Sequence, residues 1–85
     1  MKKFEYTIKD ELGIHARPAG MLAKTAKALD SEITITKGEK TGGAVKLMAL
    51  MGLGVKCGDT ITVTISGGDE DASEKTMKEF LEANL

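Results

Sequence analysis

Polar and apolar residues alternate in three stretches of the chain. Phe4, Tyr6 and Ile8 are separated by polar residues, the segment 33–36 alternates isoleucine with threonine, and the segment 60–66 reads Thr-Ile-Thr-Val-Thr-Ile-Ser. A period of two is typical of a strand that buries one face. The pattern therefore predicts three strands, of which the last has the clearest alternation.

After the first predicted strand, apolar residues recur every three to four positions instead of every two. Pro18, Leu22, Ala26 and Leu29 fall on one stripe, which predicts an amphipathic helix that ends at Asp30-Ser31. Small residues of this helix would let it lie close to a sheet: Ala19, Ala23 and Ala28.

Two further helices are predicted later in the chain. The segment 47–53 is apolar nearly all round, which indicates a short helix ended by Gly52 and Gly54, because glycine readily adopts a left-handed cap. The last helix is predicted to start after Asp69, whose side chain can cap it. Its buried stripe is expected at Met77, Phe80 and Leu81.

The segment 37–40 separates the second strand from a weaker one, and Gly38 suits a hairpin turn. The segment 40–44 predicts only a short edge strand, because Gly42 and Gly43 have no side chains to pack. The resulting order is β-α-β-β-α-β-α. One-sided strands of this kind predict an α+β fold, an open-faced β-sandwich with a four-stranded antiparallel sheet and three helices on one face.

The chain of 85 residues is expected to form one domain over 1–85, with a thin core and no large substrate cavity. Its 12 basic and 13 acidic residues give a formal charge of −1. This balance argues against a nucleic-acid groove or a basic membrane anchor, so proteins are the expected partners. No cofactor and no metal site are expected, because the one cysteine and one histidine are far apart in sequence.

The single cysteine, Cys57, is predicted to be a small, partly buried residue in a reducing environment. The N-terminal lysines are followed by no apolar run, and no stretch approaches the length of a membrane span. A cytoplasmic monomer is therefore expected.

The candidate chemistry lies in the segment Gly-Ile-His-Ala-Arg-Pro-Ala-Gly at residues 13–20, which holds the only histidine and the only proline. Pro18 suits the first turn of a helix. His15 then precedes N–H groups that favour anions, and Arg17 can bind phosphate oxygens in pairs. An unperturbed histidine has a pKa of about 6.5, so at cytoplasmic pH it keeps a neutral, nucleophilic nitrogen. The pattern fits a transient phosphohistidine.

These residue types also allow a plainer interpretation. A lone histidine can simply cap a helix, and Arg17 can form a surface ion pair with Asp10 or Glu11 that contributes little stability. Residue spacing alone leaves both interpretations open.

The motif Gly-Ile-His-Ala-Arg-Pro-Ala, followed about thirty residues later by Leu-Met-Ala-Leu-Met-Gly-Leu-Gly-Val at 47–55, resembles the HPr family. These are the histidine-containing phosphocarriers of the bacterial sugar phosphotransferase system. The resemblance covers essentially the whole chain and implies the same open-faced sandwich. It implies that His15 accepts phosphate, through Nδ1, from enzyme I charged by phosphoenolpyruvate and passes it to sugar-specific IIA proteins.

The resemblance also implies roles for other residues. Arg17 is expected to stabilise the transferring phosphoryl group. Methionine adapts to several partners, so an exposed apolar patch is predicted at Leu47, Met48 and Met51, with Leu50 in the core. The full set of expected partner-binding residues is Ala16, Ala19, Gly20, Leu47, Met48 and Met51. The family places the first and second helices side by side, which would bring His15 beside this patch.

The sequence departs from many HPr proteins at Lys46, which occupies the position of a regulatory serine ahead of the second helix. A phosphoserine would favour the positive end of a helix dipole, whereas a cation there costs about 0.3–1 kcal/mol when exposed. The sequence therefore predicts that the serine switch is absent.

Three alternatives to a phosphocarrier have different weaknesses. A regulatory relative could keep the fold and bind partners while phosphate plays a minor part, but the presence of both His15 and Arg17 argues against a version that is never phosphorylated. An acyl carrier would be all-helical with an Asp-Ser-Leu site, but Asp30-Ser31 is followed here by Glu32. An independent enzyme would need paired catalytic groups, and there is no second histidine.

Overall fold

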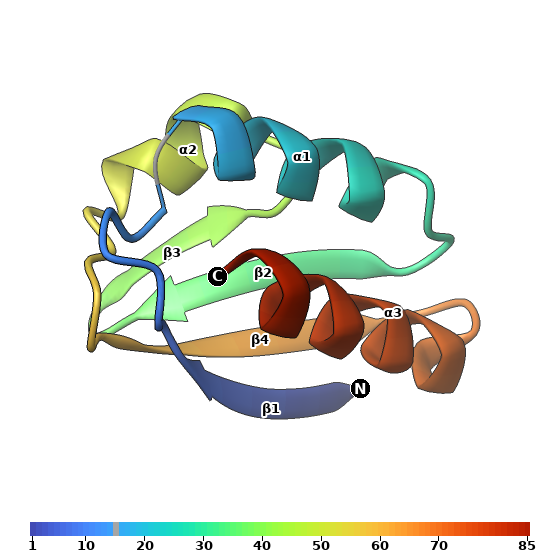
Figure 1. Ribbon diagram of the computed structural model, residues 1–85. Helices are drawn as coiled ribbons and strands as arrows, with labels where there is room; N and C mark the ends of the chain where they lie inside the picture. Colours follow the sequence, from blue (N-terminus) through green and yellow to red (C-terminus); the bar gives the residue numbers. More distant parts are fainter. Residues whose placement is uncertain (15) are drawn as a thin grey trace.

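The alternating segments form one antiparallel sheet in the order β1-β4-β2-β3, shown in the computed structural model (Figure 1), which describes residues 1–14 and 16–85. The elements follow the predicted order, and all three helices lie on one face of the sheet. Their bounds are β1 Lys2–Thr7, α1 Ala16–Lys27, β2 Glu32–Lys37, β3 Lys40–Gly43, α2 Leu47–Gly52, β4 Thr60–Ser66 and α3 Glu70–Asn84. The predicted fold class is confirmed.

Strand β4 is the centre of the core. Its Val63 lies opposite Phe4 of β1 on one side and Ile35 of β2 on the other. Ile61, Val63 and Ile65 are all fully buried. Burying a side chain of this size stabilises the fold by about 1.5–3 kcal/mol, so the alternation in β4 decides which face of the sheet the helices cover.

The other face of the sheet carries mainly threonines and remains open. Thr62 of β4 lies opposite Thr36 of β2, which in turn lies opposite Thr41 of the edge strand β3. β-Branched threonine suits a pleated surface that is only partly covered. The same alternation therefore produces a polar outer face and an apolar inner one.

Helix α1 keeps its predicted buried stripe but ends earlier than expected. Pro18 lies in its first turn, and Pro18, Leu22 and Ala26 are buried. The helix ends at Lys27, so Ala28 lies beyond it and is exposed, while Leu29 is half-buried. Of the small residues expected to face the sheet, Ala19 is buried and Ala23 is half-buried, and the backbone of α1 approaches α2 and α3.

Helix α2 is packed tightly onto β3. A Cβ atom added to the buried Gly42 would lie 3.2 Å from the carbonyl oxygen of Ala49 in α2. Gly42 weakens the strand pattern in the sequence, but its missing side chain allows α2 to pack closely on β3. Gly52 is the last residue of α2, and the left-handed conformation is taken up by Gly54, with φ of 63°.

Helix α3 starts and packs as predicted. The Asp69 carboxylate caps it by accepting a hydrogen bond from the Ala72 N–H, at 3.1 Å. Met77 and Leu81 are fully buried and Phe80 is half-buried. A buried hydrogen bond of 2.8 Å between Ser31 and Ser73 joins this helix to the chain that leaves α1. The sequence did not indicate this contact.

The prediction for Cys57 was wrong. Its side chain is exposed, in the loop between α2 and β4, with Sγ 3.7 Å from the carbonyl oxygen of Lys9. The helices of the described chain are all too short or too polar to cross a membrane.

Substituting Gly42 with alanine is expected to destabilise the fold, because the new methyl group pushes the backbone of α2. Overpacking of this kind costs about 1–3 kcal/mol. Gly43→Ala is the matched control, since its Cβ would meet only the Lys46 side chain at 3.8 Å and neither glycine has a positive φ. Urea unfolding of both variants measures the difference. Equal midpoints for the two variants would contradict this account of how α2 is seated.

Candidate functional site

The segment before α1 rests on the loop that follows α2. Gly13 has φ of 67°, and a Cβ atom there would lie 2.3 Å from the carbonyl oxygen of Val55. The N–H of the buried Ile14 donates a hydrogen bond to that same oxygen, at 3.1 Å. Only glycine can take this conformation so close to another backbone. His15 itself lies outside the described residues, between the described Ile14 and Ala16.

Arg17 is exposed in the first turn of α1. Within residues 1–14 and 16–85, no carboxylate lies within 4.0 Å of its guanidinium, so the alternative ion pair with Asp10 or Glu11 is not formed there. Asp10 instead accepts a hydrogen bond from the Leu12 N–H, at 2.9 Å. The first turn of α1 contains no acidic residue. The start of this helix is therefore suited to an anion.

A cleft of about 250 Å³ lies beside Arg17. It is formed between the first half of α1, the turn after β1 and the end of α3, and its walls are Asp10, Arg17, Pro18, Met21 and Asn84. Its volume lies below the roughly 300–1,000 Å³ that is usual for small-molecule pockets, and its wall contains both a carboxylate and a guanidinium.

The predicted apolar patch is exposed on α2. Leu47, Met48 and Met51 are 39%, 79% and 41% exposed, whereas Leu50 is fully buried, as expected. Methionine side chains that reach solvent in this way can adapt to differently shaped partners. Helices α1 and α2 lie side by side in Figure 1, and the backbone contacts agree.

The α1 residues expected to bind partners differ in their accessibility. Ala16 is exposed at the start of the helix and Gly20 is half-buried. Ala19 is fully buried, so its side chain belongs to the core and offers no surface to a partner.

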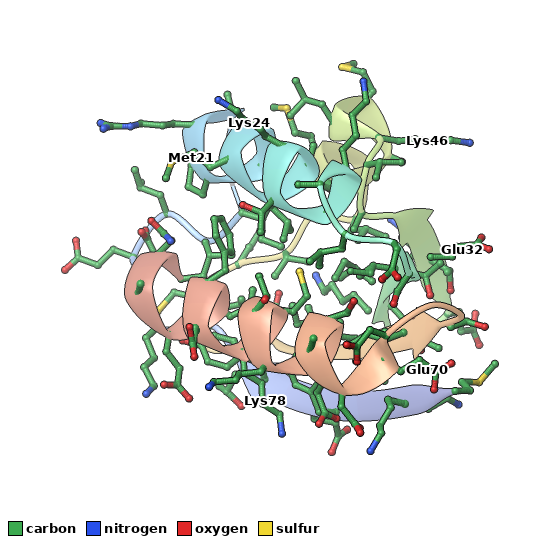
Figure 2. The ribbon with its side chains drawn as sticks, turned by 90° about the vertical axis from the view of Figure 1, so that its right-hand side faces the viewer. Met21, Lys24, Glu32, Lys46, Glu70 and Lys78 are labelled. Carbon is green, nitrogen blue, oxygen red and sulfur yellow. The ribbon has the colours of Figure 1, made fainter. Side chains whose placement is uncertain are left out.

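Besides Met1 at the N-terminus, three exposed large apolar residues were not predicted from the sequence. Leu12 in the turn before α1 is 71% exposed, Val45 before α2 is 50% exposed and Met21 is 42% exposed. Met21 lies off the buried stripe of α1 and points outward near Lys24 in Figure 2. The available signal was helical spacing, because Arg17, Lys24 and Thr25 lie three or four residues from Met21 and share its side of α1.

The acidic residues are unevenly distributed along the chain. Segments 12–29 and 40–58 contain no acidic residue, so all 13 carboxylates lie elsewhere. Figure 2 shows Lys24 and Lys46 extending from the end of the molecule formed by α1 and α2, with Glu70 of α3 well away from them. The cations of these two segments are Arg17, Lys24, Lys27, Lys40, Lys46 and Lys56. The surface formed by these two segments is therefore basic, although Asp10 of the preceding turn lines the cleft beside Arg17.

Lys46 is the N-cap residue of α2, as the sequence count predicted. It has an extended backbone, with φ of −108° and ψ of 102°, and its side chain makes no capping hydrogen bond. Its carbonyl oxygen accepts the Leu50 N–H at 3.0 Å, the first helical bond. A cation stands where an anion or a hydroxyl would be favourable.

Among residues 1–14 and 16–85, no three histidine, cysteine, aspartate or glutamate side chains gather closely enough to hold a metal ion. The start of α1, with its exposed Arg17, can bind an anion beside the apolar surface of α2.

Comparison with known proteins identifies one family. The sequence model described as the phosphorylation site of the HPr component of the phosphotransferase system matches residues 2–83. A phosphocarrier protein HPr of Mycoplasma genitalium is 41% identical over 85 residues, with 99% of this chain and 97% of that protein covered. That of Mycoplasma capricolum is 40% identical over 81 residues, with 95% and 91% covered.

The fold agrees with these relatives. The solved structure of a histidine-containing phosphocarrier protein from Mycoplasma matches with a TM-score of 0.92 and 38% identity, covering 96% of this chain and 93% of that one.

Proposed function

Because the chain belongs to the HPr family of phosphocarrier proteins, we propose that it accepts a phosphoryl group on His15 from enzyme I and passes it to IIA proteins. The carrier role is that of the family. The assignment to His15 and the two partner classes are the proposed part. The observation that carries it is the position of the only histidine, directly before a helix start that has an exposed arginine and no acid in its first turn.

Phosphoryl transfer needs little from the carrier besides a nucleophile and a favourable field. A neutral imidazole nitrogen attacks the phosphorus, the bond between phosphorus and the donor breaks, and a phosphorus–nitrogen bond forms. Charge on the transferring oxygens is stabilised by the guanidinium of Arg17 and the N–H groups at the start of α1. The described residues around the cleft offer no second acid–base pair, so we assign the remaining catalysis to the partners.

The division of charge supports acidic partner surfaces. A basic face around an apolar centre attracts a partner of opposite charge and orients it before the apolar contacts form. Leu47, Met48 and Met51 then provide area that can be covered by more than one partner shape. We infer that enzyme I and the IIA proteins dock on this same face, with the protein acting as a cytoplasmic monomer.

Lys46 is proposed to remove serine regulation while leaving the carrier function intact. Neither neighbouring hydroxyl can replace a serine at the start of α2. Ser31 is only 8% exposed and donates to the carbonyl oxygen of Gly67, at 2.6 Å. Thr41 lies in β3 and its hydroxyl pairs with that of Thr36, at 3.1 Å.

Incubation with enzyme I and labelled phosphoenolpyruvate tests the phosphate acceptor. The protein is expected to take up one acid-labile phosphate, and His15→Ala is expected to take up none. Arg17→Ala is expected to slow uptake by at least about tenfold with an unchanged unfolding midpoint, because charge stabilisation is lost but no packing contact is. Lys75→Ala, which removes an exposed cation from α3, is the control. Labelling of His15→Ala, or full speed in Arg17→Ala, would refute the respective role.

Met48→Asp is expected to weaken binding to both enzyme I and a IIA protein by about tenfold or more, because it puts a carboxylate in the centre of an apolar, basic face. Ala72→Asp adds the same charge to an exposed position of α3 and should leave both affinities unchanged. Titrations followed by NMR measure the affinity and locate the perturbed resonances. Perturbation elsewhere, with α2 unaffected, would show that the docking face is misplaced.

An HPr kinase with ATP is expected to leave the protein unmodified, since Lys46 cannot accept phosphate. The Lys46→Ser variant is expected to gain a stable phosphate, because its hydroxyl would stand at the N-cap position of α2. Mass spectrometry after the incubation distinguishes these outcomes. Stable phosphate on any serine or threonine of the unmodified sequence would contradict the proposal.

A further inference from the structure

The loop between α2 and β4 supports the histidine segment through a single peptide. The carbonyl oxygen of Val55 accepts the Ile14 N–H and lies against Gly13. Val55 itself is buried, with 3% of its surface exposed. Any shift of this peptide would therefore be transmitted directly to the residues that precede His15.

The backbone on each side of Val55 forms a hydrogen bond with a side chain from another part of the chain. Lys37, the last residue of β2, donates a hydrogen bond from Nζ to the carbonyl oxygen of Gly54, at 2.8 Å. The Asp59 carboxylate accepts the N–H of Lys56, at 2.8 Å. Gly54 and Lys56 are the neighbours of Val55 in the chain. The two side chains are also paired with each other, with Nζ 3.0 Å from Oδ2.

The backbone of Asp59 extends the same arrangement to the end of β1. Its carbonyl oxygen accepts the Ile8 N–H at 2.9 Å, and the Gly58 N–H donates to the Ile8 carbonyl oxygen at 2.8 Å. The loop is thus fixed to β1 by its backbone and to β2 by Lys37. These contacts leave the Val55 peptide with little freedom relative to the sheet.

The pair of Lys37 and Asp59 contributes to local order rather than to global stability. Each of the two side chains is about a third exposed, at 32% for Lys37 and 33% for Asp59, and an exposed pair adds little to global stability. The hydrogen bond from Lys56, and then Lys37, lowers the pKa of the Asp59 carboxyl below its ordinary value. The carboxylate is therefore charged at neutral pH and the contacts persist there.

We propose that Lys37 and Asp59 are positioning residues for phosphoryl transfer, which act by holding the Val55 peptide against which Gly13 and Ile14 rest. This proposal rests on the proposed function of His15. Neither residue is assigned a contact with the phosphoryl group, and both lie outside the apolar patch of α2. Losing either contact lets the support move, so the histidine segment spends less time in the geometry that reacts. Misplacement of about 1 Å can slow a reaction about a hundredfold.

Lys37→Met and Asp59→Ala each remove one side of the support, and the double variant removes both. Lys2→Met with Asp71→Asn is the matched control, because this pair, at 2.7 Å, also joins a strand to another element through exposed side chains. The values of kcat and KM are measured for enzyme I with each variant as phosphoryl acceptor. Hydrogen exchange of the Ile14 N–H is measured by NMR without any partner.

The two support variants are expected to lower kcat by about three- to tenfold with KM unchanged, since the docking face is intact. Exchange at Ile14 should become faster in both, and their unfolding midpoints should stay close to that of the control. A kcat equal to that of the control variant, or unchanged exchange at Ile14, overturns the positioning role alone. Failure of the unmodified protein to accept phosphate overturns the proposed function together with it.

Discussion

Burial of the inner face of the sheet is the interaction on which the rest of the structure depends. Chains of this size have enough apolar surface for one thin core, and here that core lies between the sheet and its three helices. Val63 at the centre of β4 lies opposite apolar residues on both neighbouring strands. Because every helix must cover the same apolar layer, α1 and α2 are brought side by side, although 19 residues separate them in the chain.

This packing explains why the candidate site is built from backbone contacts between elements. Gly13 accepts the close approach of Val55, and Gly42 accepts that of Ala49. Gly13 allows the chain before α1 to lie against Val55, and Gly42 allows α2 to lie against β3. Each glycine is unfavourable for regular secondary structure in its own segment, because glycine weakens strands and helices. The start of α1 thereby lies beside an exposed patch on α2, and the core beneath both remains closed.

Charge gives this surface its second property. Short segments without a single acidic residue form the face around α1 and α2, whereas α3 holds five acidic residues against two basic ones. A face of this kind attracts acidic surfaces over roughly a Debye length, about 8 Å at physiological salt. Apolar contacts at the methionines then act at close range. A carrier that meets several partners benefits from attraction that depends little on detailed shape.

Local pattern by itself determined the strands, the three helices, their order and the one-sided sheet, because period-two alternation and helical spacing are properties of neighbouring residues. It also marked residues 13–20 as the candidate site and Lys46 as the residue before α2. The burial of Ala19, the exposure of Cys57, Leu12 and Met21, and the support of Ile14 by Val55 depended on how distant segments pack. Lys37 and Asp59 are 22 positions apart in the chain, and only the folded sheet brings their side chains together around one peptide. Hydrogen bonds and ion pairs act over a few ångströms of space, so they leave no periodicity in the sequence.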